Sequence, residues 1–300
     1  MAEEQFTRSY AQDHTLKGRV FDLLECCFPG ITQAERESLA LGHPWEMAST
    51  PFVSFAGERA ITHVGLLEIP LVLLGQTVRV GGIHAVGTRP AYRRRGHYRQ
   101  VMTAVLEYCA CRYSTLLLTT GQPALYEPLG FRVLQEYIFL TSWAAPGGQQ
   151  GFQPFNPHDP HALQLLDRLL EARTPVSQIL GVVREKAVFR FNARRFPLYY
   201  AADLEAFVAC AFDGTRLRLF DIVATQVPSL EAILARFPQR IEEVVTYFSP
   251  DCLGADFQAV PHLLLDPPGA LGGAGADFLM VRGPFAAEGQ PGMLPRTARC

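Results

Sequence analysis

The most chemically informative stretch of this 300-residue sequence is an arginine-rich turn, VGTRPAYRRRGHYR, over residues 86–99. It lies between a predicted strand and a predicted helix. The amides of a first helical turn have no partner within the helix, and the helix dipole adds partial positive charge there. Several arginine side chains surround these amides, and Gly96 lets a ligand approach the backbone without a Cβ in the way. The turn therefore predicts a phosphate or diphosphate site, although an ordinary solvated helix start is the plainer alternative.

Other common phosphate-binding and hydrolase motifs are absent from the sequence. A P-loop needs G-x-x-x-x-G-K-[ST], and neither of the two lysines, Lys17 and Lys186, follows a glycine in that frame. The dinucleotide motif G-x-G-x-x-G, the elbow G-x-S-x-G and the zinc motif H-E-x-x-H do not occur. The glycine-rich residues 269–275 precede a predicted strand rather than a helix, so we interpret them as a loop.

A second segment, LYEPLGF over residues 125–131, follows thirty residues after Gly96. Together the two segments resemble the GCN5-related N-acetyltransferase (GNAT) superfamily, whose diphosphate loop reads [QR]-x-x-G-x-[GA] and whose later motif reads Y-x-x-x-G-F. Arg93 and Gly96 match the loop, whereas Tyr98 replaces its second small residue. The bulky, arginine-rich loop looks most like that of Eis-like acetyltransferases, which carry two consecutive GNAT-type domains. The resemblance is specific over residues 81–139.

This resemblance implies acetyl-CoA as co-substrate and no metal. The backbone of Val86, Gly87 and Thr88 would bind the pantetheine arm. The diphosphate would be bound by the turn that contains Arg94, Arg95, Gly96, His97, Tyr98 and Arg99. The cofactor would enter where two parallel strands, residues 77–86 and 114–119, separate. The acceptor would be a primary amine of a small molecule or a peptide, which attacks the thioester directly.

Tyr126 occupies the family's general-acid position. A phenol with a pKa of about 10 is protonated at neutral pH and can donate to a developing thiolate. The alternative is that Tyr126 is only a core aromatic residue. A base is harder to find: His84 could serve because an imidazole titrates near neutrality, but a structural histidine or an ordered water is also open. In Eis-like proteins the C-terminal carboxylate can reach the site, a role that we do not transfer to this chain.

The predicted elements place these residues on a βαβ unit. A strand at 77–86, a helix at 97–112 and a strand at 114–119 favour a partly parallel sheet. The second half starts with helices at 161–172 and 179–191. A hairpin at 206–223, a helix after Ser229 and strands at 243–248 and 278–281 follow. The order of elements thus occurs twice, but the arginine turn occurs once.

We therefore expect an α/β (α+β) fold with two tandem GNAT-like domains, each a mixed, partly parallel twisted sheet flanked by helices. The expected divisions are a catalytic domain at 1–145, a linker at 146–157, a degenerate GNAT-like domain at 158–287 and a flexible tail at 288–300. The second domain would shape the acceptor cleft or a subunit interface. An alternative function is a CoA-binding sensor or scaffold without catalysis.

The composition narrows the remaining classes. A net charge of -2 offers no general attraction to nucleic acid or to an anionic membrane. No stretch reaches the roughly 18–20 apolar residues of a membrane helix. Seven cysteines without regular spacing predict neither a disulfide framework nor a zinc site. We expect a cytoplasmic enzyme without nucleic-acid or membrane partners; whether it forms a homo-oligomer is left open.

Overall fold

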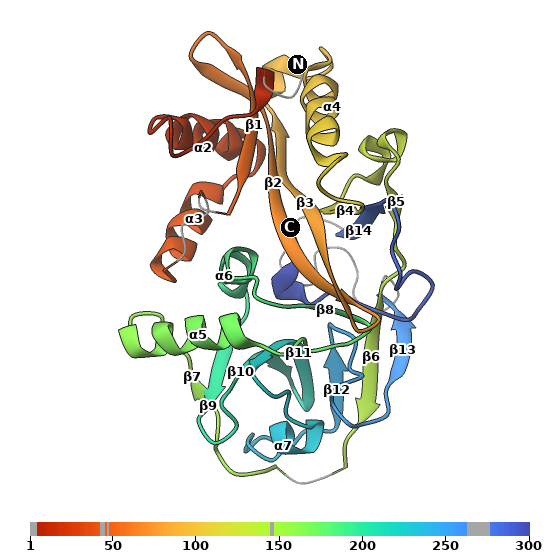
Figure 1. Ribbon diagram of the computed structural model, residues 1–300. Helices are drawn as coiled ribbons and strands as arrows, with labels where there is room; N and C mark the ends of the chain where they lie inside the picture. Colours follow the sequence, from red (N-terminus) through yellow and green to blue (C-terminus); the bar gives the residue numbers. More distant parts are fainter. Residues whose placement is uncertain (1–4, 43–45, 47, 145–146, 263–276) are drawn as a thin grey trace.

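The computed structural model describes residues 5–42, 46, 48–144, 147–262 and 277–300, and arranges them around two mixed, seven-stranded sheets (Figure 1). The glycine-rich residues 269–275 lie outside this part of the chain. Both sheets combine parallel and antiparallel neighbours, and helices pack on them. The expected mixed α/β class, with two partly parallel sheets flanked by helices, is confirmed.

The first sheet is built around the long β2–β3 hairpin. Its strand order is β1 (Thr50–Ala56), β2 (Arg59–Leu73), β3 (Gln76–Thr88), β4 (Leu116–Thr120), β14 (Phe278–Arg282) and β5 (Arg132–Val133), with β8 (Leu180–Val182) paired beside the end of β2. Leu74 and Gly75 close the hairpin with positive φ angles of 48° and 78°, as a two-residue turn of the twisted type requires. The sheet is therefore continuous from its edge strand β1 to the parallel strand β4.

Helices cover both faces of this sheet. α2 (Leu16–Cys27) and α3 (Ile31–Ala40) lie on one side, and α4 (His97–Cys109) lies on the other (Figure 1). α2 buries the apolar side chains Leu16, Val20, Leu23 and Leu24. α4 packs Val101 and Val105 into a cluster that also contains Phe52 and Tyr126. The apolar positions of both helices recur at steps of three and four, which is why each helix buries one stripe.

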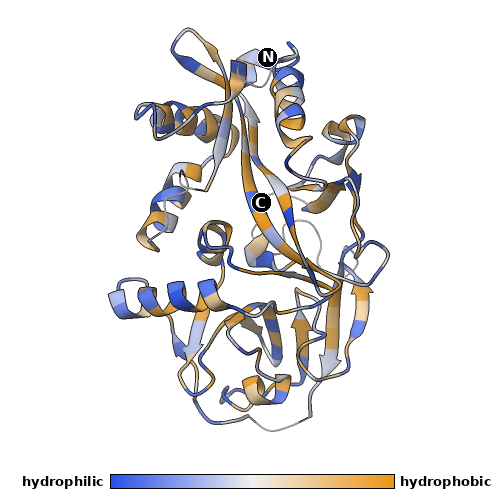
Figure 2. Ribbon diagram, viewed as in Figure 1, coloured by the Kyte–Doolittle hydropathy of each residue, from blue (hydrophilic) through white to orange (hydrophobic). Residues whose placement is uncertain are grey.

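The second sheet repeats this plan without the long hairpin. Its strand order is β13 (Gln258–Pro261), β6 (Tyr137–Ser142), β12 (Glu243–Thr246), β11 (Arg216–Ala224), β10 (Ala206–Asp213), β9 (Leu198–Ala201) and β7 (Gln153–Pro154). Its helices are α5 (Pro160–Ala172), α6 (Ala187–Ala193) and α7 (Leu230–Leu234). In Figure 2 the central strands are largely apolar, whereas α5 presents hydrophilic residues to the outside.

The two halves of the chain exchange strands, which the expected division at residue 145 does not include. β6, from the first half, pairs with β12 and β13 in the second sheet. β14, from the second half, pairs with β4 and β5 in the first sheet. Residues 288–300, which we expected to be a flexible tail, run between the sheets and bury Met293, Leu294, Thr297 and Ala298. Apolar side chains and strand hydrogen bonds fix these segments in place.

One predicted helix is wrong. Residues 179–191 do not form a single helix: Leu180–Val182 is the strand β8 on the edge of β2, and α6 begins only at Ala187. Arg184, between them, has a positive φ of 53°, which a helix does not allow. The open edge of β2 thus recruits an apolar segment whose local pattern fits either state.

Candidate active site

The first feature of the site is a gap between two parallel strands. β3 and β4 pair only from Gly81–Leu116 to Ile83–Leu118. Beyond that point Ala85 and Val86 of β3 lie opposite the single residue Val64 of β2. This is a β-bulge, and Ala85 has the positive φ of 49° that bends a strand there. β3 therefore turns away from β4, as predicted for the two strands that would hold the cofactor.

Buried contacts fix the end of β3. Arg89 is 3% exposed; its Nε donates to the carbonyl of Ala60 at 2.7 Å, and its guanidinium pairs with Asp22 of α2. Arg93 Nε donates to the carbonyl of Thr88 at 3.0 Å. Arg89, which is buried, and Arg93, which is exposed, thus hold the strand end, and Arg94, Arg95 and Arg99 are exposed further along the turn.

The turn itself exposes backbone amides. Arg94 and Gly96 have positive φ angles of 62° and 85°, and Gly96 is the N-cap of α4. The helical hydrogen bonds begin with Gln100 N, which donates to Gly96 O at 3.1 Å. The amides of His97, Tyr98 and Arg99 therefore have no acceptor within the helix.

This turn has the shape and charge of an anion site. Among the described residues, no atom lies within 4 Å of the position that a Cβ on Gly96 would take, so the space above it is open. Arg94, Arg95 and Arg99 are exposed around that space. A left-handed arginine costs about 1–3 kcal/mol, which is typical of functional turns.

Tyr98, the departure from the family pattern, points away from the turn. Its hydroxyl donates to the carbonyl of Leu125 at 3.0 Å, and its ring meets Tyr126 edge-to-face at 6.1 Å. The backbone of Tyr98 remains in the first turn of α4, while its side chain ties this helix to the segment that carries Tyr126. The bulk at this position therefore does not fill the space above Gly96.

Tyr126 lies beside the end of β4. It is 6% exposed, contacts Phe131 edge-to-face and is hydrogen-bonded to the side chain of Thr120, the last residue of β4. Burial raises its pKa to about 12, and the Thr120 contact lowers it only in part. The phenol is therefore protonated throughout the neutral range and can only donate there.

His84 lies on β3, inside the sheet. It is 5% exposed, and its Nε2 is 2.9 Å from Ser49 Oγ. Its ring covers Gly65, where a Cβ would approach the ring to 2.3 Å. Burial, helped by the neighbouring His63, holds the pKa of His84 well below its usual value. The imidazole is therefore neutral at pH 7 and has a free electron pair, but the low pKa makes it a weak base.

Sequence reasoning did not find one residue that the structure brings to the gap. Cys300 accepts a hydrogen bond from the amide of Thr119 at 2.9 Å through its backbone oxygen. No local motif marks this position, because only the path of residues 283–300 between the sheets brings it to β4.

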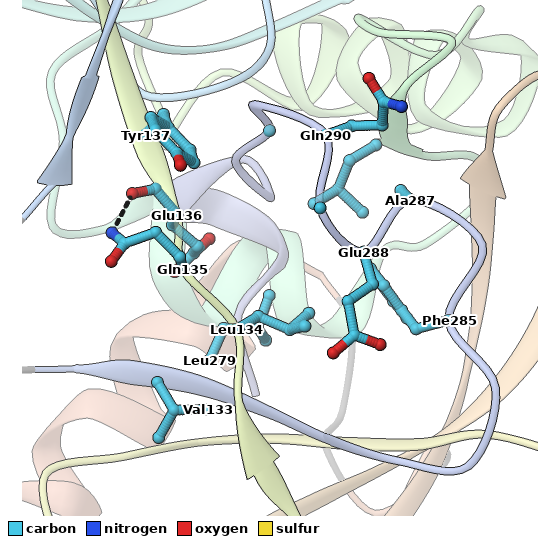
Figure 3. Close-up of a pocket in the computed structure, with 13 residues that line it drawn as sticks. Val133, Leu134, Gln135, Glu136, Tyr137, Leu279, Phe285, Ala287, Glu288 and Gln290 are labelled. Atoms are coloured by element: carbon cyan, nitrogen blue, oxygen red, sulfur yellow. Dashed lines mark hydrogen bonds between the residues drawn. The ribbon is translucent and has the colours of Figure 1, made fainter.

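A separate cavity of about 210 Å³ lies at the junction of the two sheets, away from the arginine turn (Figure 3). Gln135, Glu136, Phe285 and Gln290 are among its lining residues. Within the described ranges, no three His, Cys, Asp or Glu side chains gather where they could hold a metal ion. The helices of this part of the chain are all too short or too polar to cross a membrane.

Several solved structures share this arrangement, and two of the three that follow are described as an N-acyltransferase or N-acetyltransferase. A probable N-acyltransferase from Enterococcus faecalis superposes with a TM-score of 0.58 at 13% identity, over 92% of this chain and 71% of its own. A GCN5-related N-acetyltransferase from Kribbella flavida gives 0.51 at 18% identity, over 89% and 68%. Eis1 from Mycobacterium abscessus gives 0.53 at 16% identity, over 80% and 64%. At these identities the likeness establishes a shared fold.

Part of the sequence also matches a protein family. A family model described as an acetyltransferase (GNAT) domain matches residues 11–134, which span α2 to the end of β5 and include the turn, the gap and Tyr126. No curated protein matches the sequence significantly. Residues 11–134 therefore match a GNAT acetyltransferase domain, which supports an acetyltransferase activity.

Proposed function

We propose that the protein transfers an acetyl group from acetyl-CoA to a primary amine of a small molecule or a peptide. The observation that carries the proposal is the alignment of two features: the strands β3 and β4 separate after Ile83, and the same end of β3 leads into the arginine turn at Gly96. A long donor with a diphosphate at one end and a thioester at the other would fit both.

The diphosphate would lie on the amides of His97, Tyr98 and Arg99. Three donors that point outward from a helix start bind an anion without any rearrangement, and the dipole adds to their effect. The exposed side chains of Arg94, Arg95 and Arg99 would neutralise the remaining charge with charge-assisted hydrogen bonds. The pantetheine arm would then follow Val86, Gly87 and Thr88 into the gap.

Catalysis would depend on position and on one proton donor. The amine attacks the thioester carbon, an oxyanion forms and collapses, and the C–S bond breaks to leave CoA as a thiolate. Holding the two reactants in line lowers the barrier, because a bimolecular encounter becomes an intramolecular one. Tyr126, held beside Thr120, would donate a hydrogen bond to the sulfur as its charge develops.

The raised pKa of Tyr126 limits how far it can act as an acid. A phenol with a pKa of about 12 is a weaker acid than a thiol, whose pKa is about 8.5. Complete proton transfer from Tyr126 to the thiolate is therefore uphill, and its main contribution would be to stabilise the developing negative charge. The tyrosine then regains from solvent any proton that it gives up.

The amine must lose a proton before or during its attack. His84 remains our candidate for the residue that accepts it, but its burial and its contact with Ser49 make it a weak base. A water that carries the proton away is the other route that we propose. The reaction should then quicken as pH rises toward the pKa of the amine, about 10 for a lysine-like group.

The direct test is binding followed by turnover. Acetyl-CoA at 100 times its dissociation constant should stabilise the protein by about 2.7 kcal/mol, read as a rise in Tm. A panel of amines assayed by released thiol then separates an enzyme from a CoA-binding sensor, which would bind without turnover. An unchanged Tm at millimolar acetyl-CoA would contradict both functions.

A further inference from the structure

Residues 283–300 form an ordered strap between the two sheets, and Cys300 lies at its inner end. The strap leaves β14 at Arg282 and packs beside β6, where Gly292 O accepts from Tyr137 N at 3.0 Å. Met293 N donates to Ser249 Oγ at 3.1 Å. The strap then turns toward the first sheet, and Figure 1 shows its end beside the middle of the β2–β3 hairpin.

Cys300 occupies the inner end of the gap between β3 and β4. Its backbone oxygen accepts a hydrogen bond from the amide of Thr119, which is one residue beyond the last residue of β4 that pairs with β3. Its Sγ lies 3.7 Å from the carbonyl oxygen of Ile83, the last paired residue of β3. The same sulfur would be 3.0 Å from a Cβ on Gly82. Cys300 thus closes the gap where the strands meet.

Thr119, whose amide binds Cys300, carries a buried hydroxyl that has no hydrogen-bond partner among the described residues. Thr119 Oγ1 is inaccessible to solvent, and no hydrogen bond reaches it from any described residue. Leaving such a group unpaired costs about 1–3 kcal/mol, so native structures seldom do so without a reason. A carbonyl oxygen of a molecule that enters the gap would satisfy this hydroxyl.

Buried polar side chains of α6, of β11 and of the residue before β6 hold the strap rigidly. Asn192 Nδ2 donates to the carbonyls of Thr297 and Arg299, at 3.2 and 2.7 Å. The hydroxyl of Thr297 donates to Asp221, and the guanidinium of Arg299 donates to Glu136. These groups are all at most 8% exposed. The strap therefore cannot shift outward without breaking several buried hydrogen bonds.

We propose that Cys300 is the floor of the acyl pocket and restricts the donor to short acyl-CoA thioesters, with the Thr119 hydroxyl binding the acyl carbonyl. This inference rests on the proposed acyl-CoA function. A donor whose diphosphate lies at Gly96 enters from the open end of the gap, so its acyl group points toward the paired end. There the rigid strap leaves no room for a longer chain, because each added methylene would have to displace it.

The test compares acyl-CoA binding by calorimetry across acetyl-, propionyl-, butyryl- and hexanoyl-CoA, with turnover as a second readout. One misfit methylene in a tight pocket costs roughly 10- to 200-fold in selectivity. We expect wild type to bind acetyl-CoA at least about 10-fold more tightly than butyryl-CoA. Cys300→Gly should narrow this ratio about 10-fold, chiefly by tightening butyryl-CoA, with affinity for free CoA unchanged.

Four further variants keep the result interpretable. Cys300→Ser conserves the volume and should retain the wild-type preference, whereas Cys300→Ala should give an intermediate shift. Cys111→Ala removes an exposed thiol far from the gap and should change nothing. Thr119→Val should weaken acetyl-CoA binding but not binding of free CoA, which has no acyl carbonyl.

The outcomes distinguish failure of the proposal for Cys300 from failure of the proposed acyl-CoA function. If wild type binds CoA but Cys300→Gly and Cys300→Ala keep the wild-type acyl preference, the floor is not Cys300 and the inference is overturned alone. If wild type binds neither CoA nor any acyl-CoA, the proposed function fails and the inference falls with it. If Cys300→Ser shifts the preference as far as Cys300→Gly, volume is not the cause.

Discussion

The two halves of this molecule contain the same unit, a strand, a helix and a parallel strand, and use it in opposite ways. In the first half the unit is β3–α4–β4, and in the second it is β11–α7–β12, with Arg216–Glu243 to Leu219–Thr246 as its parallel pairs. Both pairs are short, and in both the first strand continues beyond its partner. The fold thus offers a gap twice.

The helix starts differ in what satisfies their amides. In the first half, Gly96 caps α4 without a side-chain hydrogen bond, and arginines surround it. In the second half, Ser229 Oγ accepts from Ala232 N at 3.2 Å, no arginine lies between Ala224 and Leu230, and the first turn carries Glu231. A side chain therefore occupies in α7 the role that a diphosphate would take in α4.

The gaps differ in what fills them. Two residues beyond the last pair, β3 has the bulge residue Ala85, whereas β11 has Asp221, which is fully buried. Asp221 pairs with Arg173 at 2.7 Å and accepts the hydroxyl of Thr297. The second gap is closed from within and anchors the strap that reaches the first gap. In the second sheet, Asp221 thus holds the strap in the place where the first sheet has a gap.

The largest expected effect comes from opening the second gap. Asp221→Ala leaves the guanidinium of Arg173 buried without its partner and should lower the free energy of unfolding by about 3–5 kcal/mol. Urea denaturation measures this loss. A loss below about 1 kcal/mol would mean that the second gap is not held by this pair. The control Asp203→Ala removes an exposed carboxylate of the same half and should cost far less.

The next effect concerns the chemistry of the first half. Tyr126→Phe should lower kcat about 100-fold and leave the Kd of CoA nearly unchanged, because it removes only a donor to the developing thiolate. Steady-state kinetics with released thiol, together with calorimetry, measure both. The control Tyr98→Phe removes a hydroxyl that donates to Leu125 and should cost much less in kcat. Wild-type turnover by Tyr126→Phe would leave the tyrosine only a packing role.

The pH profile tests the same residue. Burial raises the pKa of Tyr126 to about 12, so its proton stays in place up to strongly alkaline pH. We expect kcat/KM to rise with pH through 6–10 as the acceptor amine loses its proton, without a falling limb from Tyr126. A fall in wild type above pH 8 that disappears in Tyr126→Phe would show instead that the tyrosine titrates in this range.

A smaller effect is expected on CoA binding at the start of α4, where a diphosphate would lie. Arg94→Ala should weaken CoA about 10-fold, since one charge-assisted hydrogen bond to a phosphate is worth about 1.5 kcal/mol, and should leave binding of pantetheine unchanged. Equal losses for both ligands would contradict a diphosphate role. Arg240, an exposed arginine of the second half, supplies the matched control, and Arg240→Ala should affect neither ligand.

The smallest effect should be confined to the second helix start. Ser229→Ala should reduce the free energy of unfolding by about 1 kcal/mol through loss of the cap, with the Kd of CoA unchanged. Thermal denaturation with and without CoA measures both quantities. Weaker CoA binding in this variant would mean that the two starts are not independent.

The features that local sequence could predict are those built from neighbouring residues. Gly96 and the arginines mark the anion turn because a left-handed cap and exposed amides arise within a few positions. The start of α5 is also set locally, since Asp159 Oδ1 accepts from His161 N and Pro160 follows as the first helical residue. The family match over residues 11–134 confirms the interpretation drawn from these motifs.

The strand pairings between residues distant in sequence could not be predicted from local patterns. β5 and β6 are only four residues apart in sequence, yet they belong to different sheets: β5 pairs with β14, and β6 pairs with β12 and β13. Phe278 of β14 pairs with Thr120, far away in sequence. The burial of His84 and the arrival of Cys300 at the gap depend on the same distant packing, and no motif carries either.

A crystal of the protein soaked with CoA tests the central claim most directly. The structure predicts diphosphate density on the amides that follow Gly96, with the pantetheine arm running along β3 and the sulfur at the gap beside Thr119. Diphosphate density anywhere else, including the start of α7, would contradict the distinction drawn between the two halves and the function built on it.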